Sequence, residues 1–154
     1  MNKEKLKQKF YLKEQRFPPS QRIDDCFFTC KNYLLSIQPF DFLNKIKIKY
    51  NCPYAIKDNK NSPRVFAHTL HEPDRICVFE DLGKLYKKYL YGIMLHEFGH
   101  IIADHYFIDH SEDLANSIMK DFFHLTIKYS QDIFKIEFLN KRDEIKINKF
   151  KKGK

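Results

Sequence analysis

One segment, residues 82–105, constrains the fold most, because it contains no proline and repeats apolar residues at helical spacing. These side chains recur every three or four residues, as one buried helix face requires: Leu82, Leu85, Tyr89 and Ile93. The stretch GIMLHEFGHII, near the end of the segment, sets two histidines and a glutamate among core-type residues. Burying such polar groups costs free energy unless a bonding partner compensates for the lost water. The segment therefore predicts a long helix whose polar groups need a partner.

The three polar residues form the pattern H-E-x-x-H, as His96, Glu97 and His100. Four helical residues advance by about 400°, so the two imidazoles project from one face, one turn apart. Two ring nitrogens can then reach one Zn²⁺ at ~2.0–2.1 Å. Glu97, offset from them, can take a proton from a zinc-bound water and pass it to a leaving amine. A histidine pair satisfied within the core is the alternative interpretation.

Gly99 within this motif supports a crowded site. Glycine inside a helix costs about 1 kcal/mol relative to alanine. Its presence indicates close approach of another backbone or of the metal site, although ordinary helix packing would also explain it.

A catalytic zinc site needs a third protein ligand and an open fourth position. The longer pattern H-E-x-x-H-x-x-G-x-x-H is excluded, because Ala103 and Tyr106 occupy the places of its glycine and last histidine. Glu112 is the best candidate, since it begins a new helix after a short loop and its carboxylate can turn back. Three neighbours remain alternatives: Asp109, His110 and Asp113.

The helix that carries Glu112 has a clear start. Ser111 is a favourable N-cap, and the acidic Glu112 and Asp113 suit the first turn. Asn116 follows Glu112 by one turn, so its side chain could hydrogen-bond a ligating histidine.

The rest of the pattern predicts helices at both ends of the chain and a small sheet before the motif. Helices are expected at residues 3–16 and 20–37, with Ser20 capping the second one. Strands are expected at residues 46–50, 64–69 and 75–79, and a last amphipathic segment at residues 133–139. The chain is thus expected to be one α+β domain, with an N-terminal helical segment (1–40), a core (41–130) and a C-terminal amphipathic segment with a basic tail (131–154).

Composition narrows the class further. The chain has 154 residues, enough for one core, and a formal charge of +8. No signal peptide is visible, and the longest apolar run is far below the ~20 residues of a membrane span, so a cytoplasmic protein is expected. The four cysteines lack zinc-ribbon spacing and are expected to be reduced thiols. Lysines crowd both termini, which leaves a nucleic-acid surface open, but solvated helix faces and tails are the favoured interpretation.

The motif H96-E-F-G-H100, followed by E112-D-L-A-N116, resembles the gluzincin class of zinc peptidases. It is most similar to the short ImmA/IrrE-type metallo-endopeptidases of phages, mobile elements and bacteria. The similarity covers roughly residues 65–123. The spacing between His100 and Glu112 is shorter than that family leads one to expect, and Ile118-Met119 replace the Phe-Ala that often follows the signature.

This resemblance implies a minimal zincin fold, in which a few-stranded sheet packs on the active helix and its edge strand pairs with an extended substrate. Residues 65–69, which include Ala67 and His68, would form that strand, and His68 would line the cleft or lie on the surface. A tyrosine or histidine would face the zinc and stabilise the oxyanion, with three candidates: Tyr106, His124 and Tyr129.

Three functional hypotheses follow. The first is a zinc-dependent endopeptidase with a protein or peptide substrate, which the resemblance suggests is a DNA-bound repressor or similar regulator of a phage or mobile element. The second is a zincin-like binding module that contacts a protein or nucleic acid without cleaving it, although metal binding alone would not require Glu97. The third is an SprT-like zinc protease, in which His110 or His124 would replace Glu112.

Overall fold

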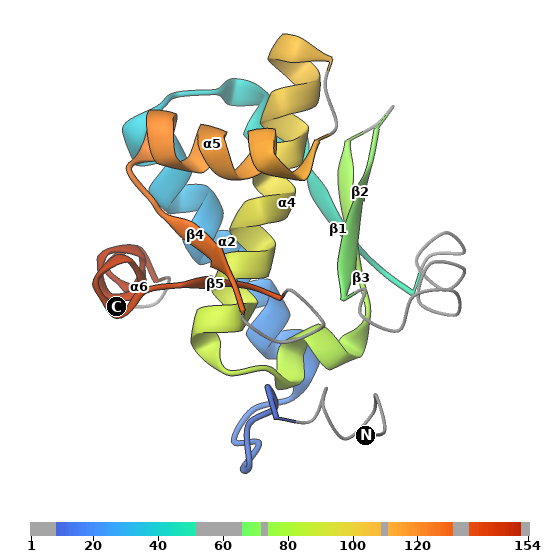
Figure 1. The fold of residues 1–154 in the computed structure, drawn as a ribbon. Coiled ribbons are helices and arrows are strands. Elements are labelled where there is room, and N and C mark those ends of the chain that lie inside the picture. The colour runs from blue at the N-terminus through green and yellow to red at the C-terminus, as the bar shows by residue number, and fades with distance from the viewer. Residues whose placement is uncertain (1–8, 52–65, 72–73, 109–110, 131–135, 152–154) are drawn as a thin grey trace.

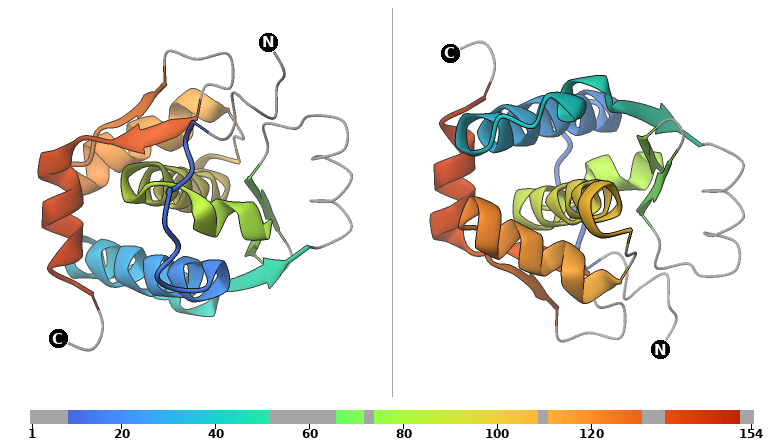
Figure 2. Two further views of the ribbon diagram at one scale, coloured as in Figure 1. Left: turned by 90° about the horizontal axis from the view of Figure 1, so that it is seen from below. Right: turned by 90° about the horizontal axis from the view of Figure 1, so that it is seen from above.

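The computed structural model describes residues 9–51, 66–71, 74–108, 111–130 and 136–151. Within these ranges the chain is α+β, with helices and two small sheets arranged around helix α4 (Lys87–Phe107) (Figure 1). Figure 2 shows α4 in the middle, with α2 (Pro19–Ile37) on one side and α5 (Glu112–Phe123) on the other. The α+β class expected from the sequence is confirmed. No helix in the described ranges has the length and apolar character that crossing a membrane requires.

Helix α4 is the centre of the core, and almost every residue from Leu90 to Ala103 is buried. It begins five residues later than the periodicity predicts. Residues Glu80–Lys84 form a separate 3₁₀ helix, η2, and Leu85 pairs with Tyr11 in an isolated bridge. The backbone N–H of Tyr86 donates to Phe10 (3.0 Å), so tertiary pairing takes backbone groups that a longer helix would use.

The N-terminal segment differs from expectation. Residues 9–16 are not helical, because Tyr11 pairs with Leu85 and Phe10 is buried against the core; residues 3–8 lie outside the described ranges. Helix α2 forms as expected, but its N-cap is Pro18 and its first residue is Pro19, so Ser20 is not the cap. Proline suits this position because its missing N–H would have no partner there. Phe27 of α2 stacks on Phe98 of α4 at 5.4 Å between ring centroids.

A three-stranded sheet precedes α4, as predicted, although residues 64–65 of the second expected strand lie outside the described ranges. Its order is β1 (Lys47–Tyr50), β3 (Arg75–Val78), β2 (Ala67–Leu70). The central strand β3 pairs in parallel with β1 and antiparallel with β2. A short 3₁₀ helix, η1 (Asp41–Lys45), leads into β1. Strand β2 lies at one edge of this sheet.

The C-terminal part contains a hairpin and a further helix. Strands β4 (Ile127–Tyr129) and β5 (Glu137–Leu139) pair antiparallel, and α6 (Lys141–Asn148) follows directly. Residues 137–139 of the expected amphipathic segment are therefore a strand, while residues 133–135 lie outside the described ranges, and a helix replaces much of the expected basic tail. Asn140 caps α6 by accepting a hydrogen bond from the backbone N–H of Asp143 (2.8 Å).

Candidate metal centre

Helices α4 and α5 bring together three side chains that could bind a metal ion. The Oε1 atom of Glu112 lies 2.6 Å from Nε2 of His96 and 2.6 Å from Nε2 of His100. The two Nε2 atoms are 3.1 Å apart. All three donor atoms lie within 4.8 Å of one another. Two imidazoles and one carboxylate are a ligand set typical of catalytic zinc, and here they converge on a single point.

The close crossing of α4 and α5 depends on Gly99. A Cβ atom at this position would collide with the backbone carbonyl of Ala115 on α5. The close backbone approach inferred from this glycine is therefore present. It places the first turn of α5 directly over the histidine face of α4.

The first turn of α5 is held by Ser111, whose Oγ accepts a hydrogen bond from the N–H of Leu114 (3.2 Å). This confirms Ser111 as the N-cap. The Glu112 side chain is 68% exposed, whereas His96 is 4% and His100 is 13% exposed. The centre is thus closed on the histidine side and open to solvent on the glutamate side, where a substrate or water could enter.

Asn116 orients one of the histidines. Its Oδ1 atom lies 2.7 Å from Nδ1 of His96. With the amide oxygen accepting, Nδ1 of His96 is the donor, and Nε2 keeps its lone pair for a metal when the ring is neutral. The role expected for Asn116 beside a ligating histidine therefore matches its position.

Glu97 is buried next to the two histidines. The hydroxyl of Thr69, on β2, donates a 2.7 Å hydrogen bond to Oε1 of Glu97 and also lies 3.3 Å from its backbone oxygen. Burial raises the pKa of the Glu97 carboxyl, while the charges of His96 and His100 and the Thr69 hydrogen bond oppose that rise. A carboxylate with a raised pKa beside a metal site suits a general base. The sequence analysis did not identify Thr69 as a site residue.

The β4–β5 hairpin adds two groups to the site. Tyr129 and Glu137 are directly paired across the hairpin, so their side chains share one face. The Tyr129 ring lies 6.4 Å from the His96 ring, and its buried hydroxyl lies near the Asn116 side chain. Tyr129 is thus the oxyanion candidate that the structure places near the histidines.

Glu137 was not anticipated from the sequence. Burial raises the pKa of Glu137 to about 7 against the opposing charge of His96, and the charges of Glu97 and Glu112 add smaller contributions in the same direction as burial. Burial, with the neighbouring carboxylates, also raises the pKa of Tyr129 to about 12. The hairpin thus supplies a carboxyl group and a phenol that both favour their neutral forms.

The side chains of His96 and Glu112 shift each other's pKa values strongly. Burial lowers the pKa of His96, but the hydrogen bond with Glu112 and the nearby Glu137 and Glu97 charges outweigh it and raise the pKa to about 10. The hydrogen bonds with His100 and His96 hold the pKa of Glu112 well below its usual range. These pKa shifts favour a protonated His96 paired with an ionised Glu112, so any metal ion that bound here would have to displace the proton on His96.

Several predicted residues lie elsewhere. Thr69 faces α4, so Ala67 shares that face of β2, whereas His68 points to the opposite face. His124 follows the last residue of α5, about 18 Å along the helix from Glu112, and so lies far from the centre. Tyr106 packs against Phe40 and is half exposed.

The alternatives to Glu112 are not in the cluster. Asp113 is exposed and is not among the side chains that converge on the histidines. Asp109 and His110 lie outside the described residues.

A second group of potential ligands joins the β2–β3 turn to the end of α4. His71 Nδ1 lies 2.8 Å from Asp74 Oδ1 and 3.4 Å from Asp104 Oδ2. All three side chains are partly exposed, and one histidine between two carboxylates is the arrangement of an ordinary ion-pair link. It ties the sheet to α4 beside the candidate centre.

No protein-family model, curated protein or solved structure matches the chain. The interpretation of the candidate site therefore rests on its sequence and geometry.

Proposed function

We propose that the chain is a zinc-dependent metallo-endopeptidase in which His96, His100 and Glu112 hold the metal and Glu97 is the general base. The observation that carries this proposal is the position of Glu112 Oε1, 2.6 Å from the Nε2 atoms of both histidines. The donor set fits zinc, and Asn116 leaves the Nε2 atom of His96 facing it.

Zinc bound there would polarise the scissile carbonyl and lower the pKa of a water molecule. The protein's part is proton transfer and alignment. Thr69 holds one carboxylate oxygen of Glu97, which leaves the carboxylate oriented to take a proton from water and return it to the leaving amine. Tyr129, with its buried hydroxyl and a pKa near 12, would donate a hydrogen bond to the developing oxyanion.

The substrate we propose is an extended segment of a protein. Strand β2 is an edge strand, and its Thr69 contacts the general base, so a peptide paired along β2 would pass the metal centre. By its resemblance to ImmA/IrrE-type enzymes, the chain would cleave a regulatory protein of a phage or mobile element.

Two other functions have less support. A binding module that never cleaves its partner would not need a buried, hydrogen-bonded Glu97 beside the ligands. An SprT-like site would need a third histidine, and His124 lies at the wrong end of α5 for that role.

The decisive experiment compares zinc content and peptide cleavage in four variants with the wild type. We expect Glu97→Gln to keep zinc and lose cleavage, and His100→Ala to lose both. Glu112→Ala should lose zinc, whereas Asp113→Ala, its matched neighbour on the same helix turn, should keep it. Undiminished cleavage by Glu97→Gln would refute the proposed mechanism.

The choice of third ligand is tested separately. Zinc retained in Glu112→Ala but lost in Asp113→Ala would move the third ligand by one residue.

A further inference from the structure

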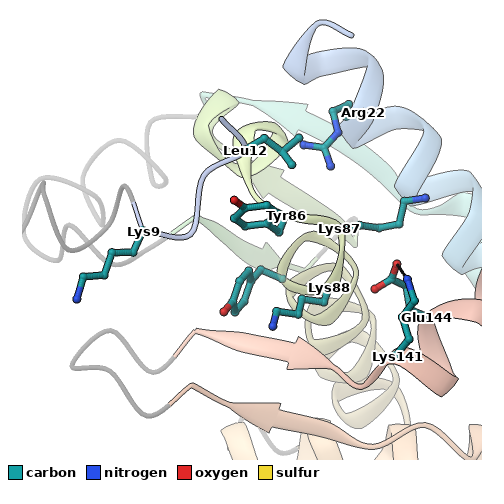
Figure 3. A pocket seen from close by; sticks show the side chains of 9 residues that line it. Lys9, Leu12, Arg22, Tyr86, Lys87, Lys88, Lys141 and Glu144 are labelled. Carbon is teal, nitrogen blue, oxygen red and sulfur yellow. Dashed lines mark ion pairs between the residues drawn. The ribbon is translucent and has the colours of Figure 1, made fainter. Parts of the chain in front are cut away.

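A second candidate site lies at the N-terminal end of α4, away from the candidate metal centre near the middle of that helix. It is a cavity of about 570 Å³ between the N-terminal segment and the starts of α2, α4 and α6 (Figure 3). Lys87, the first residue of α4, lies nine residues before His96, about 14 Å along the helix axis. This cavity is therefore distinct from the metal centre.

The charged lining of the cavity is strongly one-sided. Five cationic side chains surround it with a single carboxylate: Lys9, Arg22, Lys87, Lys88, Lys141 and Glu144. The carboxylate is already engaged, because Glu144 Oε2 lies 3.7 Å from Nζ of Lys141. The lining therefore carries a formal excess of four positive charges after Glu144 has neutralised one of the five cations.

Lys87 lies at the centre of this charge. Figure 3 shows its side chain between Arg22 of α2 and Glu144 of α6. Burial lowers the pKa of Lys87, and the charges of Lys151, Arg22 and Lys141 lower it further, against the opposing effect of Glu144. A partly buried ammonium group among other cations is unfavourable unless an anion joins it.

Arg22 is fixed at the edge of the cavity. Its Nη1 atom donates hydrogen bonds to the backbone oxygens of Gly83 (2.6 Å) and Leu85 (2.8 Å). These bonds attach the guanidinium to the segment that leads into α4, so its position is set before any ligand arrives. Such preorganisation lowers the entropic cost of binding.

The start of α4 strengthens the same electrostatic field. Its first turn has no side-chain cap and no acidic residue, and instead contains Lys87 and Lys88. The positive end of a helix dipole disfavours cations and favours anions. A negatively charged group in the adjoining cavity would therefore stabilise the two lysines at this end of the helix.

We infer that this cavity binds a small ligand that carries a phosphate or diphosphate group. A volume of about 570 Å³ is in the range of small-molecule pockets. A ligand with one carboxylate would neutralise only one of the four excess positive charges, whereas a phosphate or diphosphate brings several charges and acceptor oxygens. Tyr86 and Tyr89 in the lining supply aromatic surface for an organic part of the ligand. The inference does not depend on the peptidase proposal.

The test is a calorimetric titration of the protein with phosphate-bearing probes at low salt. The protein is first treated with a chelator, so that no zinc remains to bind the phosphate groups. The probes are pyrophosphate, adenosine diphosphate and a single-stranded oligonucleotide. We expect saturable one-to-one binding of the first two, weakened about tenfold or more by Lys87→Gln and by Lys141→Gln. Lys49→Gln, an exposed lysine on β1 with the same charge change, should bind as the wild type does.

The two small probes identify the source of the phosphate. Equal affinities for the two probes would show that the cavity recognises the phosphate groups alone. Tighter binding of adenosine diphosphate, with the difference abolished by Tyr86→Ala, would show that it recognises a nucleotide. Absence of saturable binding at millimolar concentration would overturn the inference. So would equal losses in Lys49→Gln and Lys87→Gln, or binding of the oligonucleotide alone. Thermal melting of each variant separates a lost site from a lost fold.

Discussion

Asn116 on α5 fixes the ring of His96 on α4, through a 2.7 Å contact between Oδ1 and Nδ1. Loss of such an outer hydrogen bond typically weakens metal binding by about 10- to 100-fold. We therefore expect Asn116→Ala to lower zinc affinity by that factor, measured by competition with a chromogenic chelator. Ser117→Ala, on the exposed face of the same helix, is the matched control, and equal effects in both would contradict the assigned role.

Thr69 is expected to act through Glu97 rather than through the metal. Replacement by valine keeps the shape and removes the hydroxyl that donates to Glu97 Oε1. We expect Thr69→Val to keep full zinc content and to lose about tenfold in kcat/KM, the worth of one hydrogen bond to a charged group. Thr69→Ser should restore most of the rate. A zinc loss in Thr69→Val would indicate a structural role instead.

Gly99 and Gly92 allow two different elements to approach α4. A Cβ atom at Gly99 would strike the Ala115 carbonyl of α5, and one at Gly92 would strike the Phe138 backbone of β5. We expect each alanine variant to lose about 1–3 kcal/mol or more of unfolding free energy, measured by denaturant titration. Only Gly99→Ala should also weaken zinc binding, because it displaces Glu112. Equal zinc affinities in the two variants would contradict this division.

Glu137 makes the stability of the metal-free protein depend on pH. Its pKa is raised from 4.5 to about 7, so the folded state holds the proton more tightly than the unfolded state does. The stability that this proton contributes is complete below about pH 4.5 and is lost as the pH rises through 7. A glutamine does not titrate in this range, so Glu137→Gln keeps its stability as the pH rises. We therefore expect the variant to gain about 1–3 kcal/mol over the wild type between these two pH values.

The measurement is the difference in unfolding free energy between variant and wild type across that range. The difference cancels the contributions of the other titrating groups. A difference that does not change with pH would contradict the buried, neutral carboxyl.

Local sequence patterns predicted those site residues whose positions depend only on neighbours within one helix turn. The spacing of His96 and His100 places them on one face, and the capping serine at 111 fixes where α5 begins, so Glu112 could be named as well. Gly99 signalled the crossing because a glycine inside a helix needs a reason. Each of these inferences uses residues within a few positions of one another.

The residues that were missed depend on contacts between distant segments. Thr69 reaches Glu97 only because β2 packs beside α4, and Glu137 reaches the centre only through its pairing with Tyr129. Strands of three residues, such as β4 and β5, are too short to show an alternating pattern. Tyr11 shows the opposite case, in which pairing with Leu85 overrides a local helical tendency.

The order of strands in the main sheet has a consequence for how the protein is made. The central strand β3 is the last of the three to leave the ribosome, roughly 25 residues after β1. At typical translation rates of roughly 5–20 residues per second, β1 waits about one to five seconds for β3, whereas β2, which ends just before β3 begins, waits about a second or less. During synthesis β1 is therefore the strand that stays longest without its partner, and its unpaired backbone is the part of the sheet most exposed to chaperones in that interval.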